Sequence, residues 1–204
     1  MTQLVLTAIG EDREGLVSAL ARVVETQGGN WLDSQFARLA GTFAGIVLVE
    51  IDESRATALE AAVADLLAEV GWSIEVTRAP ESPAAAAGDE GPTGDSAATG
   101  TGGAAGHRAA APLRVHLLGQ DRPGMVHQVS RALAEQGVSI ESFRSWTLDA
   151  PEGGGVLFEA EALVRLPRSE AGVAAGDVVR SVLEPIANDL MVDLDLDDAA
   201  VAGA

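Results

Sequence analysis

The stretch Gly10-Glu-Asp-Arg-Glu-Gly15 returns 109 positions later in the chain as Gly119-Gln-Asp-Arg-Pro-Gly124. Each copy follows a short apolar run and opens an amphipathic stretch, and the copies share eight of nineteen residues without a gap. The chain of 204 residues is therefore a duplication centred on a strand–turn–helix junction. A helix that begins at the end of a strand presents backbone N–H groups without intrahelical acceptors, and these groups can hold an anion such as a carboxylate.

The segment between the two copies differs sharply in composition. Of the 33 residues at positions 80–112, 27 are Gly, Ala, Pro, Ser or Thr, and none is Leu, Ile, Val, Phe, Met or Trp. Such a segment buries too little apolar surface to offset the entropy of ordering it. We therefore expect a first domain at residues 1–79, a flexible linker at 80–112, a second domain at 113–197 and a disordered tail at 198–204.

Hydrophobic periodicity predicts the same order of elements in both halves. In the first half we expect helices at 14–27 and 54–70 and strands at 4–9, 31–39, 43–51 and 72–77. In the second half we expect helices at 123–136 and 169–187 and strands at 113–118, 138–148, 156–166 and 190–196. The order β-α-β-β-α-β, found twice, predicts an α+β fold of two ferredoxin-like domains, each a four-stranded antiparallel sheet with two helices on one face.

Finer expectations concern the helix faces and ends. Periodicity places the residues Val17, Leu20, Val24, Val126, Val129 and Leu133 on the inner faces of the first helices. Ser54 is expected to cap the second helix, and Pro123 is expected at the first helical position, where a missing N–H costs nothing. Trp31 and Trp72 are expected in the core or at an interface.

Composition excludes several classes of function. The chain has no lysine and no cysteine, which rules out Schiff-base, Walker-lysine, thiol and disulfide chemistry. The net charge is −18 and acids outnumber arginines in both halves, so we expect no direct nucleic-acid binding and no anionic membrane partner. No nucleophile–base–acid arrangement is evident, so we expect no enzyme activity, no metal and no cofactor. No apolar run approaches 18 residues, and we expect a cytoplasmic protein.

The Asp-Arg-x-Gly turn, taken with the β-α-β-β-α-β order, resembles the ACT domain, a small regulatory amino-acid-binding module. The stretch Gly28-Gly-Asn30-Trp-Leu-Asp33-Ser34, followed by Gly41-Thr-Phe43, is similar to the family's second strand and hairpin, which in close relatives reads Gly-x-Asn-Ile-x-Asp-Ser. Two such domains and little else resemble the glycine cleavage system transcriptional repressor family. The resemblance covers both halves but not the linker.

This resemblance implies a non-enzymatic regulatory protein that senses an amino acid or a similar small metabolite. It implies a homodimer or an intramolecular ACT pair that acts through contacts with a regulatory protein partner, in transcriptional regulation of amino-acid metabolism such as that of glycine. The alternative is a passive dimerisation or scaffold module with a decayed ligand site. A hydrolase of the acylphosphatase type, with Asn30 orienting a water, is the least favoured reading.

In amino-acid-binding members of the family the ligand lies near the first turn, often at an interface between two domains. The resemblance places the contacts of the first half at Asp12, Gly15 and Asn30. It places those of the second half at Asp121, Gly124, His127 and Ser139, where Ser139 replaces the family's Asn. Arg13 and Arg122 stand beside the helix N-termini, where an arginine can hold a carboxylate bidentately. Glu14 replaces the usual Pro and adds a negative charge, so the two sites are expected to be unequal.

Each of these residues also has a purely structural reading. Asp12 and Asp121 can cap the helix that follows, and Asn30 can shape a turn. Gly10 and Gly119 are expected to serve the geometry of the turn. His127 lies off the apolar face of its helix and is expected to be solvated.

Overall fold

The computed structural model describes residues 1–79, 112–151, 154–165, 175–190 and 192–198. The first half contains β1 (Thr2–Glu11), α1 (Leu16–Thr26), β2 (Asn30–Leu39), β3 (Thr42–Ile51), the 3-10 helix η1 (Glu53–Arg55), α2 (Ala56–Val70) and β4 (Ser73–Arg78). The second half contains β5 (Leu113–Gln120), α3 (Met125–Glu135), β6 (Ser139–Asp149), β7 (Val156–Arg165), α4 (Ala175–Leu190) and β8 (Val192–Asp198). The element order predicted for both halves is confirmed. The predicted linker and tail lie outside the described residues, apart from Pro112 and Asp198.

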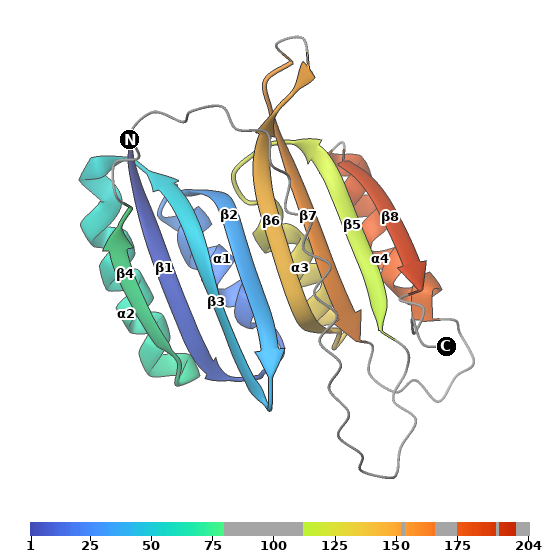
Figure 1. Cartoon of the computed structure of the whole chain (residues 1–204), viewed down its shortest axis with the longest axis horizontal. Coiled ribbons are helices and arrows are strands. Elements are labelled where there is room, and N and C mark those ends of the chain that lie inside the picture. The colour runs from blue at the N-terminus through green and yellow to red at the C-terminus, as the bar shows by residue number, and fades with distance from the viewer. Residues whose placement is uncertain (80–111, 152–153, 166–174, 191, 199–204) are drawn as a thin grey trace.

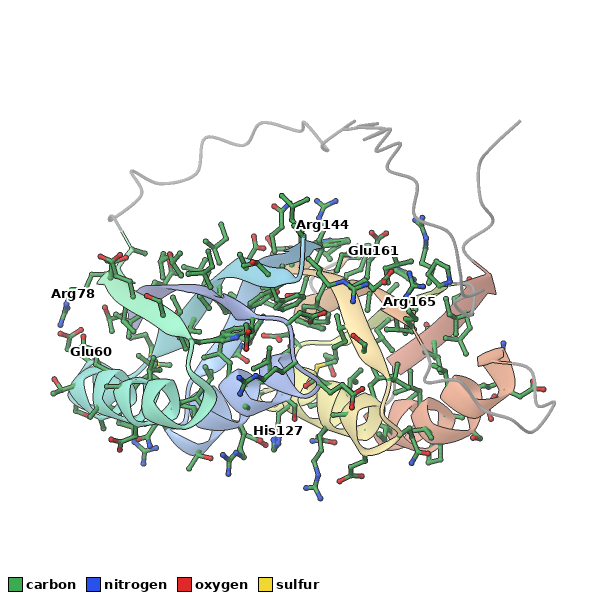
Figure 2. All side chains as sticks on the ribbon, turned by 90° about the horizontal axis from the view of Figure 1, so that it is seen from below. Glu60, Arg78, His127, Arg144, Glu161 and Arg165 are labelled. Atoms are coloured by element: carbon green, nitrogen blue, oxygen red, sulfur yellow. The ribbon has the colours of Figure 1, made fainter. Side chains whose placement is uncertain are left out.

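The two halves share one continuous sheet. Its strand order is β4-β1-β3-β2-β6-β7-β5-β8, and neighbouring strands run antiparallel. Each half keeps its own four strands, and β2 and β6 join the halves at the centre (Figure 1). Among the described residues, the four α-helices cover one face of this sheet and none lies on the other face, as Figure 2 shows from the side. The sequence predicted two four-stranded sheets but did not predict that they would join edge to edge.

The junction of β2 and β6 is built like part of a core. Ser34 pairs with Ser145, and Phe36 pairs with Phe143. In the aligned repeats, Ser34 is equivalent to Phe143, and Phe36 is equivalent to Ser145. Exchanging the two halves therefore leaves these strand pairs unchanged, so a local two-fold axis relates the halves. The hydroxyl oxygens of Ser34 and Ser145 lie 2.7 Å apart, and Trp31 Nε1 donates to Ser145 Oγ at 3.2 Å. Both serines are buried, so the junction is a packed and hydrogen-bonded interface.

The predicted inner faces of the first helices are confirmed. The buried residues of α1 and α3 include Val17, Leu20, Val24, Val126, Val129 and Leu133. Trp31 and Trp72 are also buried, and they flank a stack of Phe36 on Phe43 with ring centroids 5.4 Å apart. The few aromatic rings of the first half therefore form one cluster beneath the sheet.

Both first helices begin later than periodicity predicted, and the reason is a glycine. Gly15 and Gly124 are the N-cap residues, with φ of 81° and 89°, a left-handed conformation that costs other residues energy. Helix α3 starts at Met125, so Pro123 lies in the turn and not at the first helical position. Neither helix has a side-chain cap, so the capping role considered for Asp12 and Asp121 is wrong.

Two further local expectations are wrong. Gly10 and Gly119 lie within β1 and β5 and not in the turns. A Cβ on Gly10 would overlap the indole ring of Trp72, so close packing requires glycine there. The chain before α2 is capped by Asp52 and not by Ser54, because the Asp52 side chain accepts from the Ser54 N–H at 2.9 Å at the start of η1.

Candidate ligand-binding site at the interface of the two halves

Two small cavities lie where the strand–helix turn of one half meets the first helix of the other. We call them the Gly124 site and the Gly15 site. The Gly124 site is lined by Ala21, Val24, Glu25, Gly29, Trp31, Arg122, Gly124, Met125, Val126, His127 and Phe158. The Gly15 site is lined by Asp12, Arg13, Gly15, Leu16, Val17, Ser18, Phe43, Ser130, Ala134, Val138 and Ile140. Each cavity has a volume of about 10 Å³, close to the space of one water molecule.

Each site draws its residues from both halves, because the local two-fold axis sets α1 beside α3. The turn comes from one half, and the end of the first helix and the start of the second strand come from the other. Asn30 therefore meets Asp121 of the second half, and the neighbours of Ser139 line the site of the first half. The expectation that Asp12, Gly15 and Asn30 act together within the first half is wrong.

Next to the Gly124 site, although not among the residues that line its cavity, Asn30 and Asp121 form a pair with unpartnered oxygens. Asn30 Nδ2 donates to Asp121 Oδ2 at 2.7 Å. The other two oxygens, Asn30 Oδ1 and Asp121 Oδ1, are buried and accept no hydrogen bond within the described part of the chain. The first intrahelical bond of α3 runs from Gln128 N to Gly124 O at 3.0 Å, so three N–H groups precede it without an intrahelical acceptor. These oxygens and N–H groups thus belong to the turn before α3 and to the start of β2, which contacts that turn.

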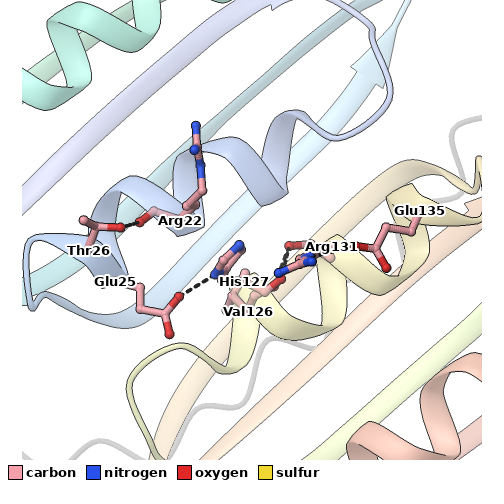
Figure 3. Close-up of polar contacts among 8 residues, drawn as sticks. Arg22, Glu25, Thr26, Val126, His127, Arg131 and Glu135 are labelled. Carbon is pink, nitrogen blue, oxygen red and sulfur yellow. Dashed lines mark hydrogen bonds and ion pairs between the residues drawn. The ribbon is translucent and has the colours of Figure 1, made fainter.

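A carboxylate of the protein itself lies at this helix N-terminus. Glu25, near the end of α1, places its Oε2 in contact with Nδ1 of His127 in the first turn of α3 (Figure 3). A Cβ built on Gly124 would overlap the carboxylate of Glu25, so a side chain at this position would displace Glu25, and the positive φ also favours glycine there. The side chain of His127 is only 15% exposed, so the expectation that it is solvated is wrong.

The Gly15 site has different chemistry at the equivalent positions. Asp12 Oδ2 accepts from Arg38 Nη1 at 3.0 Å. The second nitrogen of Arg38 contacts Glu141 of the other half, which also accepts from Arg165 Nε at 2.7 Å. The turn aspartate is therefore part of an ion-pair network across the interface and does not face an amide. Arg13 pairs with Glu11 at 3.0 Å, and both side chains are well exposed.

The structure thus separates the predicted residues into two groups. The first group is at the Gly124 site, which Arg122, Gly124 and His127 line and next to which Asn30 bonds Asp121. The second group is at the Gly15 site, which Asp12, Arg13 and Gly15 line together with Val138 and Ile140, the neighbours of Ser139. Sequence reasoning missed Glu25, although the duplication carried a signal for it. In the aligned copies Glu25 stands opposite Ala134 and His127 stands opposite Ser18, so both partners of this contact are specific to one site.

A larger hollow of about 560 Å³ lies on the helix-free face near the β2–β6 junction, and it includes Asp33, Arg144 and Trp146. Figure 2 shows Arg144 and Glu161 on this face, opposite His127. The guanidinium of Arg144 lies 5.8 Å from the centroid of the Trp146 ring. Partial burial raises the pKa of Asp33, while the Ser34 N–H and Arg144 act in the opposite direction.

With this geometry in view, comparison with known proteins decides the family. Models of the ACT domain match residues 2–77 and residues 114–161. The chain belongs to the ACT-domain family. It is a tandem ACT protein whose two domains pair side by side within one polypeptide.

Solved structures resemble this tandem ACT protein over most of its length. An unknown protein from Galdieria sulphuraria is 24% identical, with 98% of this chain and 99% of that chain covered and a TM-score of 0.42. A candidate glycine cleavage system transcriptional repressor is 18% identical, with 96% of each chain covered and a TM-score of 0.37. Aspartate kinase from Synechocystis is 16% identical, with 92% of this chain but 27% of that chain covered and a TM-score of 0.52, which supports the fold. No curated protein matches the chain. Within the described ranges, no helix is long and apolar enough to cross a membrane.

Proposed function

We propose that this tandem ACT protein is a non-enzymatic sensor that binds one free amino acid at the Gly124 site and transmits the signal through protein contacts. The observation that carries the proposal is the Asn30–Asp121 pair, whose two remaining oxygens are buried and unpartnered beside the N-terminus of α3. Buried acceptors without partners are costly, and a ligand that donates hydrogen bonds to them removes that cost.

An amino acid matches the hydrogen-bonding groups that lie there. Its ammonium group has three N–H donors, as a lysine ammonium does, and can serve both Asn30 Oδ1 and Asp121 Oδ1. Its carboxylate suits the N–H groups and the positive end of the helix dipole at the start of α3, with Arg122 lining the same cavity. Trp31 and Phe158 supply apolar walls.

At the Gly15 site, a passive structural role fits better than ligand binding. There Asp12 is bound to Arg38, and Ala134 and Ser18 stand where the other site has Glu25 and His127. We therefore infer one ligand per chain and a structural role for the Gly15 site. Because the ligand would touch both ACT domains, binding would tighten their contact and favour one geometry of the pair.

Any effect on transcription would pass through a partner protein, because acids outnumber arginines in both domains and neither offers the basic surface that DNA requires. Regulation of glycine metabolism is the pathway that the sequence resemblance favours.

Thermal unfolding of the full chain with each common amino acid tests the proposal. A ligand at 100 times its Kd stabilises the folded state by about 2.7 kcal/mol, which raises Tm by several degrees in a protein of this size. The shift should disappear in Asn30→Ala and persist in Ser139→Ala, the equivalent change at the other site. Failure of every amino acid to raise Tm at millimolar concentration would refute the proposal.

A further inference from the structure

We propose that Glu25 is an internal competitor of the ligand: its carboxylate occupies the position that the carboxylate of an amino acid takes at the Gly124 site. The inference rests on the proposed function and adds the residue that sets the affinity of the site. An incoming amino acid would have to displace Glu25 from His127 before its own carboxylate could reach the turn.

The position of the Glu25 side chain is the first argument. Its Oε1 lies so close to Gly124 that even a methyl group on that residue would overlap it, and its Oε2 contacts His127 Nδ1. A carboxylate at the start of α3 is favoured by the helix dipole, whichever molecule carries it. Figure 3 shows that this carboxylate reaches across the interface from α1.

The size of the cavity is the second argument. With Glu25 in place, the Gly124 site has room for about one water molecule, which is too little for an amino acid. The Glu25 side chain is 38% exposed, so it has access to solvent and can rotate away from His127. That movement frees the space beside Gly124 and leaves the oxygens of Asn30 and Asp121 in place to receive the ammonium group.

The Gly15 site provides the third argument, because it shows that the fold does not require this contact. Ala134 occupies the position equivalent to Glu25, and a Cβ on Gly15 would lie 3.7 Å from the Cβ of Ala134, an ordinary contact. The turn and both helices form equally well there without a carboxylate or an imidazole. The contact between Glu25 and His127 is thus specific to the Gly124 site and is not needed to form the turn.

The consequence is a lower apparent affinity. When only a fraction of molecules has Glu25 displaced, the apparent Kd equals the intrinsic Kd divided by that fraction. Removing the carboxylate should therefore tighten amino-acid binding by about tenfold or more, whereas Glu25→Gln, which keeps the shape but loses the charge, should tighten it less.

The first arm of the test uses acetate as the probe, because it is a carboxylate without an ammonium group. In Glu25→Ala the vacated position should bind acetate, which should raise Tm above its value in sodium chloride of equal concentration. Wild type and the control Glu60→Ala, which removes an exposed acid from α2, should show no such rise. In protein labelled with 5-fluorotryptophan, acetate should move the ¹⁹F resonance of Trp31 but not those of Trp72 and Trp146. An equal response in wild type, Glu60→Ala and Glu25→Ala would overturn the inference, and Glu25→Ser, which also vacates the position, gives the same comparison if the alanine variant folds poorly.

The second arm measures binding of the amino acid that stabilises the protein best. Tighter binding in Glu25→Ala than in wild type supports the inference, and equal binding overturns it while leaving the proposed function intact. An acetate response without binding of any amino acid would instead refute the proposed function and retain Glu25 as the occupant of an anion position.

Discussion

Gly15 and Gly124 hold the same position in the repeat but meet different demands. Both need a left-handed backbone, with φ of 81° and 89°. A side chain at position 124 would also displace the carboxylate of Glu25, whereas Gly15 faces Ala134 at an ordinary distance. Substitutions at the two positions should therefore separate two losses of stability: the one caused by a positive φ and the one caused by overlap with Glu25.

Gly15→Ala should destabilise the fold by about 1–2 kcal/mol, the usual cost of a left-handed residue with a Cβ. Gly124→Ala should cost more, because the new methyl group pushes Glu25 away from His127. Chemical denaturation of both variants, each with and without Glu25→Ala, measures the difference. The excess cost at Gly124 should vanish when Glu25 is absent, and an excess that persists in that background would contradict the described contact.

The second prediction at this scale concerns Asp33 and pH. Burial raises the pKa of Asp33, so its charged form is less favourable in the folded protein than in the unfolded chain. The carboxyl therefore lowers stability above its folded pKa and has no such effect once both states are protonated, below about pH 4. Asp33→Asn should be more stable than wild type at neutral pH, and the gain should fade on acidification. A gain that is independent of pH in denaturant titrations would rule out this cause.

The residues of the candidate site show what a sequence can and cannot reveal. The repeated turn led to the resemblance to the ACT domain, and that resemblance identified Asp121, Gly124 and Asn30 as residues of interest. It could not reveal that Asn30 meets the turn of the other domain, since that contact depends on how the two sheets join. His127 was read as solvated because nothing on its own helix shows the approach of Glu25 from α1.

Among the elements, β2 and β6 decide how the molecule is built. Their positions before hairpin turns predicted the two strands well, because turn residues between two apolar runs are a local signal. This signal does not tell which edge a strand pairs with, so the ladder between Ser34–Ala37 and Ser142–Ser145 was not predictable. The helix starts were misplaced for a related reason, since periodicity does not report the φ of Gly15 and Gly124.

The buried hydroxyl groups at this ladder give a prediction for the junction. Ser145 Oγ bonds both Ser34 Oγ and Trp31 Nε1, so Ser145→Ala leaves two buried polar groups without this partner. Each lost partner in a buried setting costs about 1–3 kcal/mol. Ser34→Ala should cost less, because the bond between Trp31 and Ser145 remains. Equilibrium unfolding of the two variants checks this order, and a larger loss in Ser34→Ala would contradict it.

At the scale of the whole molecule, each ACT domain covers the free strand edge of the other through the pairing of β2 with β6. The junction buries Phe36 and Phe143 under the shared sheet, and the Arg38–Glu141 contact closes it on the side of the Gly15 site. Each domain alone would expose an unpaired strand edge, which favours association. The linker contributes no large apolar residue to either core.

Residues 1–79 and 113–198, produced as separate chains, should therefore fold and associate one to one. Analytical ultracentrifugation of the mixture should show the heterodimer, and Arg38→Ala should weaken it. Two halves that stay apart at micromolar concentration would show that the linker, and not the interface, holds the pair together.

The central claim is that one amino acid binds per chain, between the domains, at Asn30 and Asp121. Calorimetric titration of the full chain with the amino acid that stabilises it most tests this claim directly. We predict a stoichiometry of one, binding that is lost in Asn30→Ala and Asp121→Asn, and binding that persists in Ser139→Ala and Asp12→Asn. Two equal sites per chain, or unchanged binding in Asn30→Ala, would contradict the account.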